Sequence, residues 1–122
     1  MALLDLLENF RNIKGFMAGG ILDFTGDILE TLSEQEQIDL AMVGATYTDI
    51  FRNANEAAAK IGLEQAIEMT IVTPKGVVIM SSTGVEAPVN ALMIIILDED
   101  GNQALTRMTI KKVVPQIISE LG

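Results

Sequence analysis

The sequence predicts an α+β domain in which a five-stranded antiparallel sheet packs against three helices. Short segments in which apolar and polar residues alternate, separated by turn residues, indicate strands. Segments whose apolar residues recur every three or four positions indicate helices. Hydrophobic residues make up 49% of the 122 residues and aromatic residues only 4%, so we expect an aliphatic core. The expected order is α-β-β-α-β-β-β-α, in one domain over residues 1–122.

The first expected elements are a short helix and a hairpin. Residues 2–13 place leucines and a phenylalanine at helical spacing, and Gly15 would stop the helix. Two strands are expected at residues 16–22 and 28–32, with Thr25-Gly26 in the turn between them.

A long helix is expected next. Ser33 and Glu36 have the spacing of a capping box, which predicts that the helix begins at Ser33. It can continue to Ile61, because Gly62 is a favourable residue just after a helix end. Such a helix would be about 40 Å long, which is more than a small domain needs to cover its own sheet.

Three stripes run along this helix. An apolar stripe, expected to pack on the chain's own core, consists of Leu40, Val43, Tyr47, Ile50, Ala54, Ala57 and Ile61. A polar stripe consists of Asp39, Thr46, Asp49, Asn53, Glu56 and Lys60. Between them lies a small-residue stripe, against which another helix could lie closely: Ala41, Gly44, Ala45, Thr48, Phe51, Asn55 and Ala58.

Three further strands are expected at residues 65–73, 77–82 and 91–97. In the first of these, Ile67, Met69 and Ile71 would share one face. A turn with Pro74 at its second position leads to the next strand.

The chain is expected to end in a helix whose apolar residues recur from Ile110 to Leu121. Pro115 inside this helix predicts a kink. Asn102, Thr106 or Thr109 could cap its start.

The composition excludes several classes of function. The absence of cysteine and histidine excludes thiolate and Ser-His-Asp catalysis, and cysteine or imidazole metal sites. A formal net charge of −9 argues against nucleic-acid binding and against attraction to anionic lipid. Residues 1–14 lack the basic region of a signal peptide, and the longest strongly apolar run, 91–97, is too short to span a bilayer. We therefore expect a cytoplasmic protein, not an enzyme, with no cofactor and no catalytic or metal-binding residues.

The acidic segment ILDEDGN, residues 96–102, could be a metal site or a turn. It fails as a calcium loop, because placing Gly101 at the invariant glycine puts Ile96 at the first position and Arg107 at the chelating last position. The sequence favours a turn in which Asp98 and Asp100 bond local amides and Gly101 adopts a positive φ. The similar segment ILDFTGD, residues 21–27, is interpreted in the same way.

Two further motifs are weaker candidates. The glycines of GFMAGG, residues 15–20, lack the Lys and Ser or Thr of a phosphate-binding loop, and are expected to allow close approach of the backbone. Arg52, near the polar stripe, is the arginine best placed to meet a partner, where it could act as an arginine finger on a GTPase or simply be a solvated residue.

The order of elements resembles the roadblock family, which comprises dynein light chains and bacterial and archaeal partners of Ras-like small GTPases. The resemblance covers residues 3–121 and is carried by the glycine-containing hairpin ending in ILDFTGD, the long alanine-rich helix, and the three strands ending in IIILDEDGN.

This resemblance implies a profilin-like α/β sandwich and a homodimer, in which two sheets join edge to edge through the third strand and the long helices lie side by side. The dimer interface would contain the small-residue stripe of the long helix together with three residues of the third strand: Ala41, Gly44, Ala45, Thr48, Phe51, Asn55, Ala58, Ile67, Met69 and Ile71. The implied surface for a partner protein is Asp39, Asp49, Arg52, Asn53 and Glu56.

The implied function is a non-catalytic dimeric regulatory or scaffold module that binds a Ras-like small GTPase and modulates its GTP hydrolysis. An alternative is a dimeric adaptor that links larger proteins, as dynein light chains do, without affecting nucleotide turnover. A third possibility is a small-molecule sensor or enzyme on a similar sandwich, such as a PAS-like or GAF-like domain. It is weakened by the missing histidine and cysteine and by the few aromatic residues.

Overall fold

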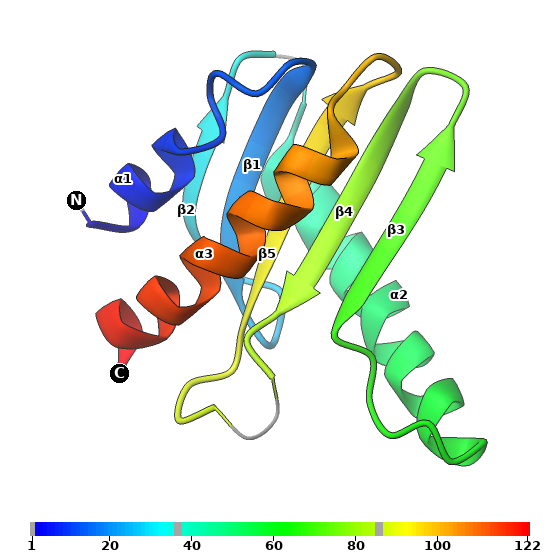
Figure 1. Cartoon of the computed structure of the whole chain (residues 1–122). Coiled ribbons are helices and arrows are strands. Elements are labelled where there is room, and N and C mark those ends of the chain that lie inside the picture. The colour runs from blue at the N-terminus through cyan, green and yellow to red at the C-terminus, as the bar shows by residue number, and fades with distance from the viewer. Residues whose placement is uncertain (1, 36–37, 85–86) are drawn as a thin grey trace.

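A five-stranded antiparallel sheet lies between two layers of helices (Figure 1). The computed structural model describes residues 2–35, 38–84 and 87–122. Helices α1 (Ala2–Glu8) and α3 (Gln103–Leu121) cover one face of the sheet, and α2 (Leu40–Lys60) covers the other. The strands are β1 (Phe16–Asp23), β2 (Ile28–Ser33), β3 (Glu68–Thr73), β4 (Gly76–Ser82) and β5 (Ala91–Asp98), in the spatial order β2-β1-β5-β4-β3. The α+β class, the element order and the five-stranded antiparallel sheet are therefore confirmed.

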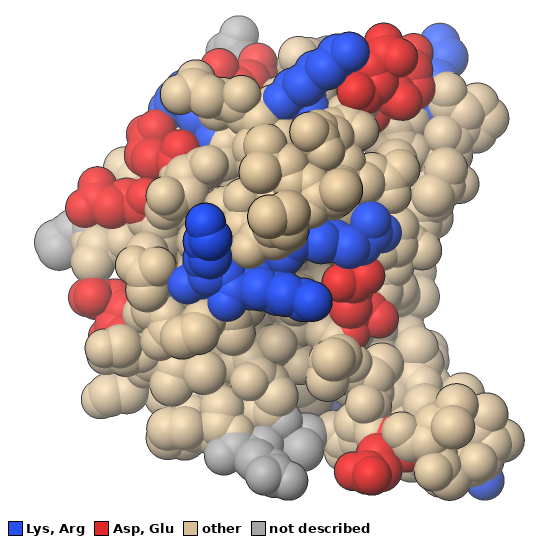
Figure 2. Space-filling view, viewed as in Figure 1, with Lys and Arg blue, Asp and Glu red and all other residues tan. Residues whose placement is uncertain are grey.

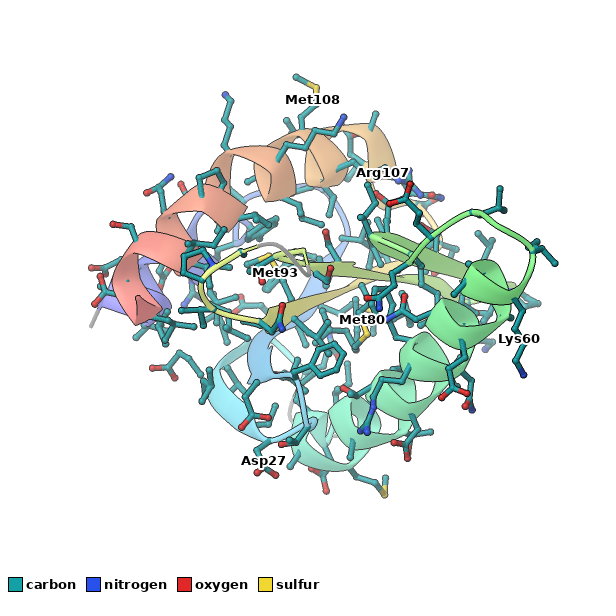
Figure 3. All side chains as sticks on the ribbon, turned by 90° about the horizontal axis from the view of Figure 1, so that it is seen from below. Asp27, Lys60, Met80, Met93, Arg107 and Met108 are labelled. Atoms are coloured by element: carbon teal, nitrogen blue, oxygen red, sulfur yellow. The ribbon has the colours of Figure 1, made fainter. Side chains whose placement is uncertain are left out.

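The central strand β5 is buried on both faces, which explains its continuous run of apolar residues. Its side chains alternate between two cores: Met93 lies toward α1 and α3, whereas Met80 of the neighbouring strand lies toward α2 (Figure 3). The cores are aliphatic apart from Phe10 on the α1–α3 side and Phe51 on the α2 side, which are among the largest fully buried side chains.

The predicted start of the long helix is wrong. Ser33 is the last residue of β2, where it pairs with Ala18, and its hydroxyl donates to the Gln35 carbonyl at 2.7 Å. Glu36, the other half of the expected capping box, lies outside the described residues. Asp39 is the actual N-cap, because its carboxylate accepts a hydrogen bond from the Met42 amide at 3.2 Å. Strand pairing therefore outweighs the local capping signal, and the helix has 21 residues.

The predicted helix end is confirmed. Gly62 has a φ of +82°, its amide donates to the Ala59 carbonyl, and the Leu63 amide donates to the Ala58 carbonyl. This pair of bonds is the Schellman motif, in which glycine is favoured because it adopts positive φ without strain.

Two elements are shorter than predicted. α1 ends at Glu8, and the chain continues to Ile13 in tight turns, such as the hydrogen bond from the Phe10 amide to the Leu7 carbonyl at 3.0 Å. β3 begins at Glu68 because the preceding segment is tied to α2: the Asn55 side-chain oxygen accepts the Ala66 amide hydrogen at 2.8 Å.

α3 continues as one helix through Pro115. Of the three predicted caps, Asn102 is the N-cap, and its side chain accepts the Leu105 amide hydrogen at 3.0 Å. Thr106 and Thr109 instead donate their hydroxyls to carbonyls four residues earlier.

Gly15 and Gly101 hold the start of β1 against the turn after β5. The Asp98 amide donates to the Gly15 carbonyl at 2.8 Å, and a Cβ atom at Gly15 would overlap the Cα atom of Gly101. Gly15 has a positive φ, but Gly101 does not, so that prediction is wrong. Gly101 is instead required by space, since its Cβ atom would lie 2.5 Å from the Cβ atom of Leu97.

This contact predicts unequal effects for two glycine substitutions. Gly62→Ala introduces backbone strain but meets no atom within 4 Å, so it should cost about 1 kcal/mol. Gly15→Ala introduces comparable strain and a clash with backbone, so it should lower the free energy of unfolding by at least about 2 kcal/mol more. Urea unfolding of both variants measures this difference, and equal losses would contradict the close contact.

Candidate functional site

The rotation of α2 about its axis decides which of its stripes is available to other molecules. Gly44, Thr48, Phe51 and Asn55 of the small-residue stripe are buried against the chain's own sheet. Thr48 and Phe51 have no exposed surface, so these two residues cannot contact another helix in this arrangement. Ala41 and Ala45 are exposed and Ala58 is half-buried, so only these three of the stripe can still meet a second chain.

Gly44 lies where α2 approaches β1 closely. A Cβ atom at this position would lie 2.6 Å from Cδ2 of Leu22, which is fully buried in β1. A glycine here lets the helix backbone approach the sheet closely.

The apolar stripe was expected to pack on the chain's own core, and its first residues do so. Leu40 is buried, and Val43 and Tyr47 are half-buried against the core on the α2 side of the sheet. Further along the same stripe, Ile50 is 41% exposed and Ile61 is 72% exposed. The far end of this stripe is therefore one of the apolar surfaces that the described residues leave uncovered.

The strand expected to pair with a second copy lies at an edge of the sheet. Among the described residues, β3 hydrogen-bonds to β4 on one side only, so its other side offers unpaired backbone groups. Met69 and Ile71 share one face as predicted, since both pack against the core on the α2 side, but Ile67 precedes the strand and lines a groove beside α3. Ile67 therefore does not share their face.

The polar stripe points away from the sheet. Asp39, Asp49, Arg52, Asn53 and Glu56 are all exposed. Arg52 is held loosely, with a nitrogen 3.9 Å from an Asp49 oxygen and its guanidinium 5.8 Å from the centre of the Phe24 ring. Asp39 also has the structural role of capping α2.

The two acidic turns have structural roles. Asp23 accepts hydrogen bonds from the amide and hydroxyl of Thr25 and from the Asp27 amide, and the Thr25 hydroxyl bond is the main cause of its lowered pKa. Asp98 accepts the Asp100 amide hydrogen at 2.8 Å, as expected of a turn. Among the described residues, no acidic group of three or more could hold a metal ion.

None of the described helices is both long enough and apolar enough to cross a membrane.

The fold belongs to a known structural class, that of Roadblock/LC7 domains. An MglB with a tetrameric arrangement superposes with a TM-score of 0.83 at 15% identity, over 97% of this chain and 85% of that one. The gliding protein MglB of Thermus thermophilus superposes with a TM-score of 0.81 at 15% identity, over 99% of this chain and 90% of that one. A Roadblock/LC7 domain from Streptomyces avermitilis gives 0.79 at 9% identity, over 97% and 92%.

These likenesses confirm the roadblock resemblance at the level of the fold. Profilin IA of Acanthamoeba castellanii also matches, with a TM-score of 0.55 at 16% identity over 88% of this chain and 89% of that one, which agrees with a profilin-like sandwich. No protein-family model and no curated protein sequence matches the chain.

Two buried threonine hydroxyls, Thr48 on α2 and Thr106 on α3, differ in their hydrogen bonding, which predicts opposite effects on stability when each is removed. In the described part of the chain the buried Thr48 hydroxyl has no hydrogen-bond partner, whereas the buried Thr106 hydroxyl donates to the Asn102 carbonyl at 2.8 Å. Thr48→Val should raise the free energy of unfolding by about 1 kcal/mol, because it removes an unpaired polar group. Thr106→Val should lower it by about 1 kcal/mol. Chemical denaturation measures both, and a destabilised Thr48→Val variant would contradict the inward orientation.

Proposed function

We propose that the protein is a non-catalytic, dimeric module that binds a Ras-like small GTPase in the cytoplasm and modulates its GTP hydrolysis. The main support is the Roadblock/LC7 fold combined with exposed apolar residues of α2 and with the position of β3 at an edge of the described sheet. The tetrameric arrangement of the similar MglB is consistent with self-association.

The dimer that we propose differs from the one expected from the sequence. Its interface combines the unpaired edge of β3, the half-buried Met69 and Ile71, and the exposed part of the apolar stripe around Ile50 and Ile61. Two copies related by a two-fold axis would bring each apolar stripe against the other copy, since such an interface is self-complementary. Pairing would also satisfy the free backbone groups of β3.

Two α2 helices placed side by side would form a platform with both polar stripes facing outward. Asp39, Asp49, Arg52, Asn53 and Glu56 would contact the GTPase. Such a platform would act by positioning the catalytic groups of the GTPase, which suits a chain without histidine or cysteine.

The dimer can be tested with one substitution on each of two sides of α2. Ile50→Glu places a charge within the proposed interface and should weaken self-association at least about tenfold. Met42→Glu is the matched control, because Met42 is 63% exposed and lies outside the apolar stripe. Light scattering over a range of concentrations should give a dimer mass for the wild type and Met42→Glu. A wild-type monomer at every concentration would exclude the proposed dimer.

The platform can be tested with charge reversals. The double variant D49K/E56K should weaken binding of the partner GTPase about tenfold, whereas E99K/E120K changes the same charge at exposed sites elsewhere and should not. GTP hydrolysis and binding should be followed with Ras-like GTPases from the same organism. Hydrolysis that stays enhanced with Arg52→Ala would exclude an arginine finger, and binding without any change in hydrolysis would indicate an adaptor instead.

A further inference from the structure

A groove of about 300 Å³ lies between α3 and the ends of β3 and β4. It exists because α3 crosses the sheet obliquely, leaving the lower ends of these two strands uncovered on that face (Figure 1). Ile67, Ile110, Val114 and Pro115 contribute apolar surface to the groove. Ile67 is 70% exposed, so a large aliphatic side chain at the rim remains in water unless another molecule covers it.

Cations form the other notable part of the groove. α3 carries three of the chain's eight cations, Arg107, Lys111 and Lys112, and only one of its seventeen acids. Figure 2 shows Lys and Arg side chains gathered over α3 in the middle of this face, while most acids lie around its margin. These three cations form a positive patch on a strongly acidic protein.

Arg107 and Lys111 have different roles in this patch. The Arg107 guanidinium lies 3.0 Å from a Glu68 carboxylate oxygen and donates to the Thr70 hydroxyl at 2.8 Å, so it joins α3 to β3. Lys111 has no ion pair with any described residue, although it also lines the groove. Its ammonium group is thus available to an anion from outside the chain.

The three hydroxyl groups of the groove all bond to the backbone. Ser81 donates to the Ile67 carbonyl at 3.3 Å, Thr83 donates to the Val89 carbonyl at 2.7 Å, and Ser82 accepts the Gly84 amide hydrogen at 3.1 Å. Recognition in the groove therefore depends on aliphatic surface and positive charge.

We propose that this groove binds a segment of a partner protein that carries aliphatic side chains next to carboxylates. The aliphatic groups would cover Ile67 and Val114, and a carboxylate would pair with Lys111. The net charge of −9 opposes an anionic membrane, whereas a short acidic segment meets only the local positive patch. Because the groove and α2 lie on opposite faces of the sheet, this interaction does not depend on the proposed GTPase platform and leaves it free.

The proposal can be tested by selecting ligands for the whole chain from a display library of random peptides. The enriched peptides should combine acidic and aliphatic residues. Their affinity, measured by fluorescence anisotropy, should fall at least about tenfold for K111E/K112E and should fall with added salt. Ile67→Ser should also weaken binding. The matched control K14E/K75E makes the same charge change at exposed lysines; Lys75 lies in the turn at the other end of β3 and β4, and this control should bind as the wild type does.

Several outcomes would overturn the proposal. These are a selection without binders, binders that lack acidic residues, and equal losses in K111E/K112E and K14E/K75E. Co-sedimentation with vesicles of phosphatidylcholine and phosphatidylserine that is abolished by K111E/K112E would assign the patch to lipid instead. Matching unfolding curves for the two double variants ensure that lost binding does not reflect lost folding.

Discussion

The close approach of α2 to β1 is the constraint on which the rest of the molecule depends. Gly44 allows it, because any side chain there would meet the buried Leu22. Once this contact fixes the rotation of the helix, Thr48, Phe51 and Asn55 must face the sheet. The apolar stripe then lies along one side of α2, and the polar stripe faces away from the sheet. The residues that α2 buries against the sheet therefore decide which of its surfaces other proteins can reach, and Gly44 allows the close approach.

Periodicity was sufficient to predict the class and order of the elements, because the buried faces of strands and helices repeat along the sequence. It was not sufficient to predict which side of α2 faces the sheet. Gly44, Thr48, Phe51 and Asn55 recur at helical spacing like any core stripe, but the small and polar side chains in the same stripe made it resemble a helix–helix contact. The glycine at the centre of that stripe was the available signal, since a glycine within a helix often marks close packing.

The other differences from the sequence predictions also arise from contacts that are distant along the chain. Ser33 is a good helix cap locally, but pairing with Ala18 keeps it in β2. Gly101 was expected to adopt an unusual backbone conformation, whereas it is required because Leu97 occupies the adjacent space. The groove beside α3 could not be predicted. Ile67 and Val114 line it together only because of the angle at which α3 crosses the sheet, and the sequence does not reveal that angle.

The ion pair between Arg107 and Glu68 links the groove beside α3 to the edge strand β3. Both residues line the groove, and the same pair anchors β3, whose far side is the free edge of the sheet. A molecule seated in the groove would act on this strand from one side while a neighbouring chain acts on it from the other. If binding in the groove changes the affinity of β3 for a neighbouring chain, that chain must change the affinity of the groove for its ligand by the same factor, because coupling free energies are reciprocal.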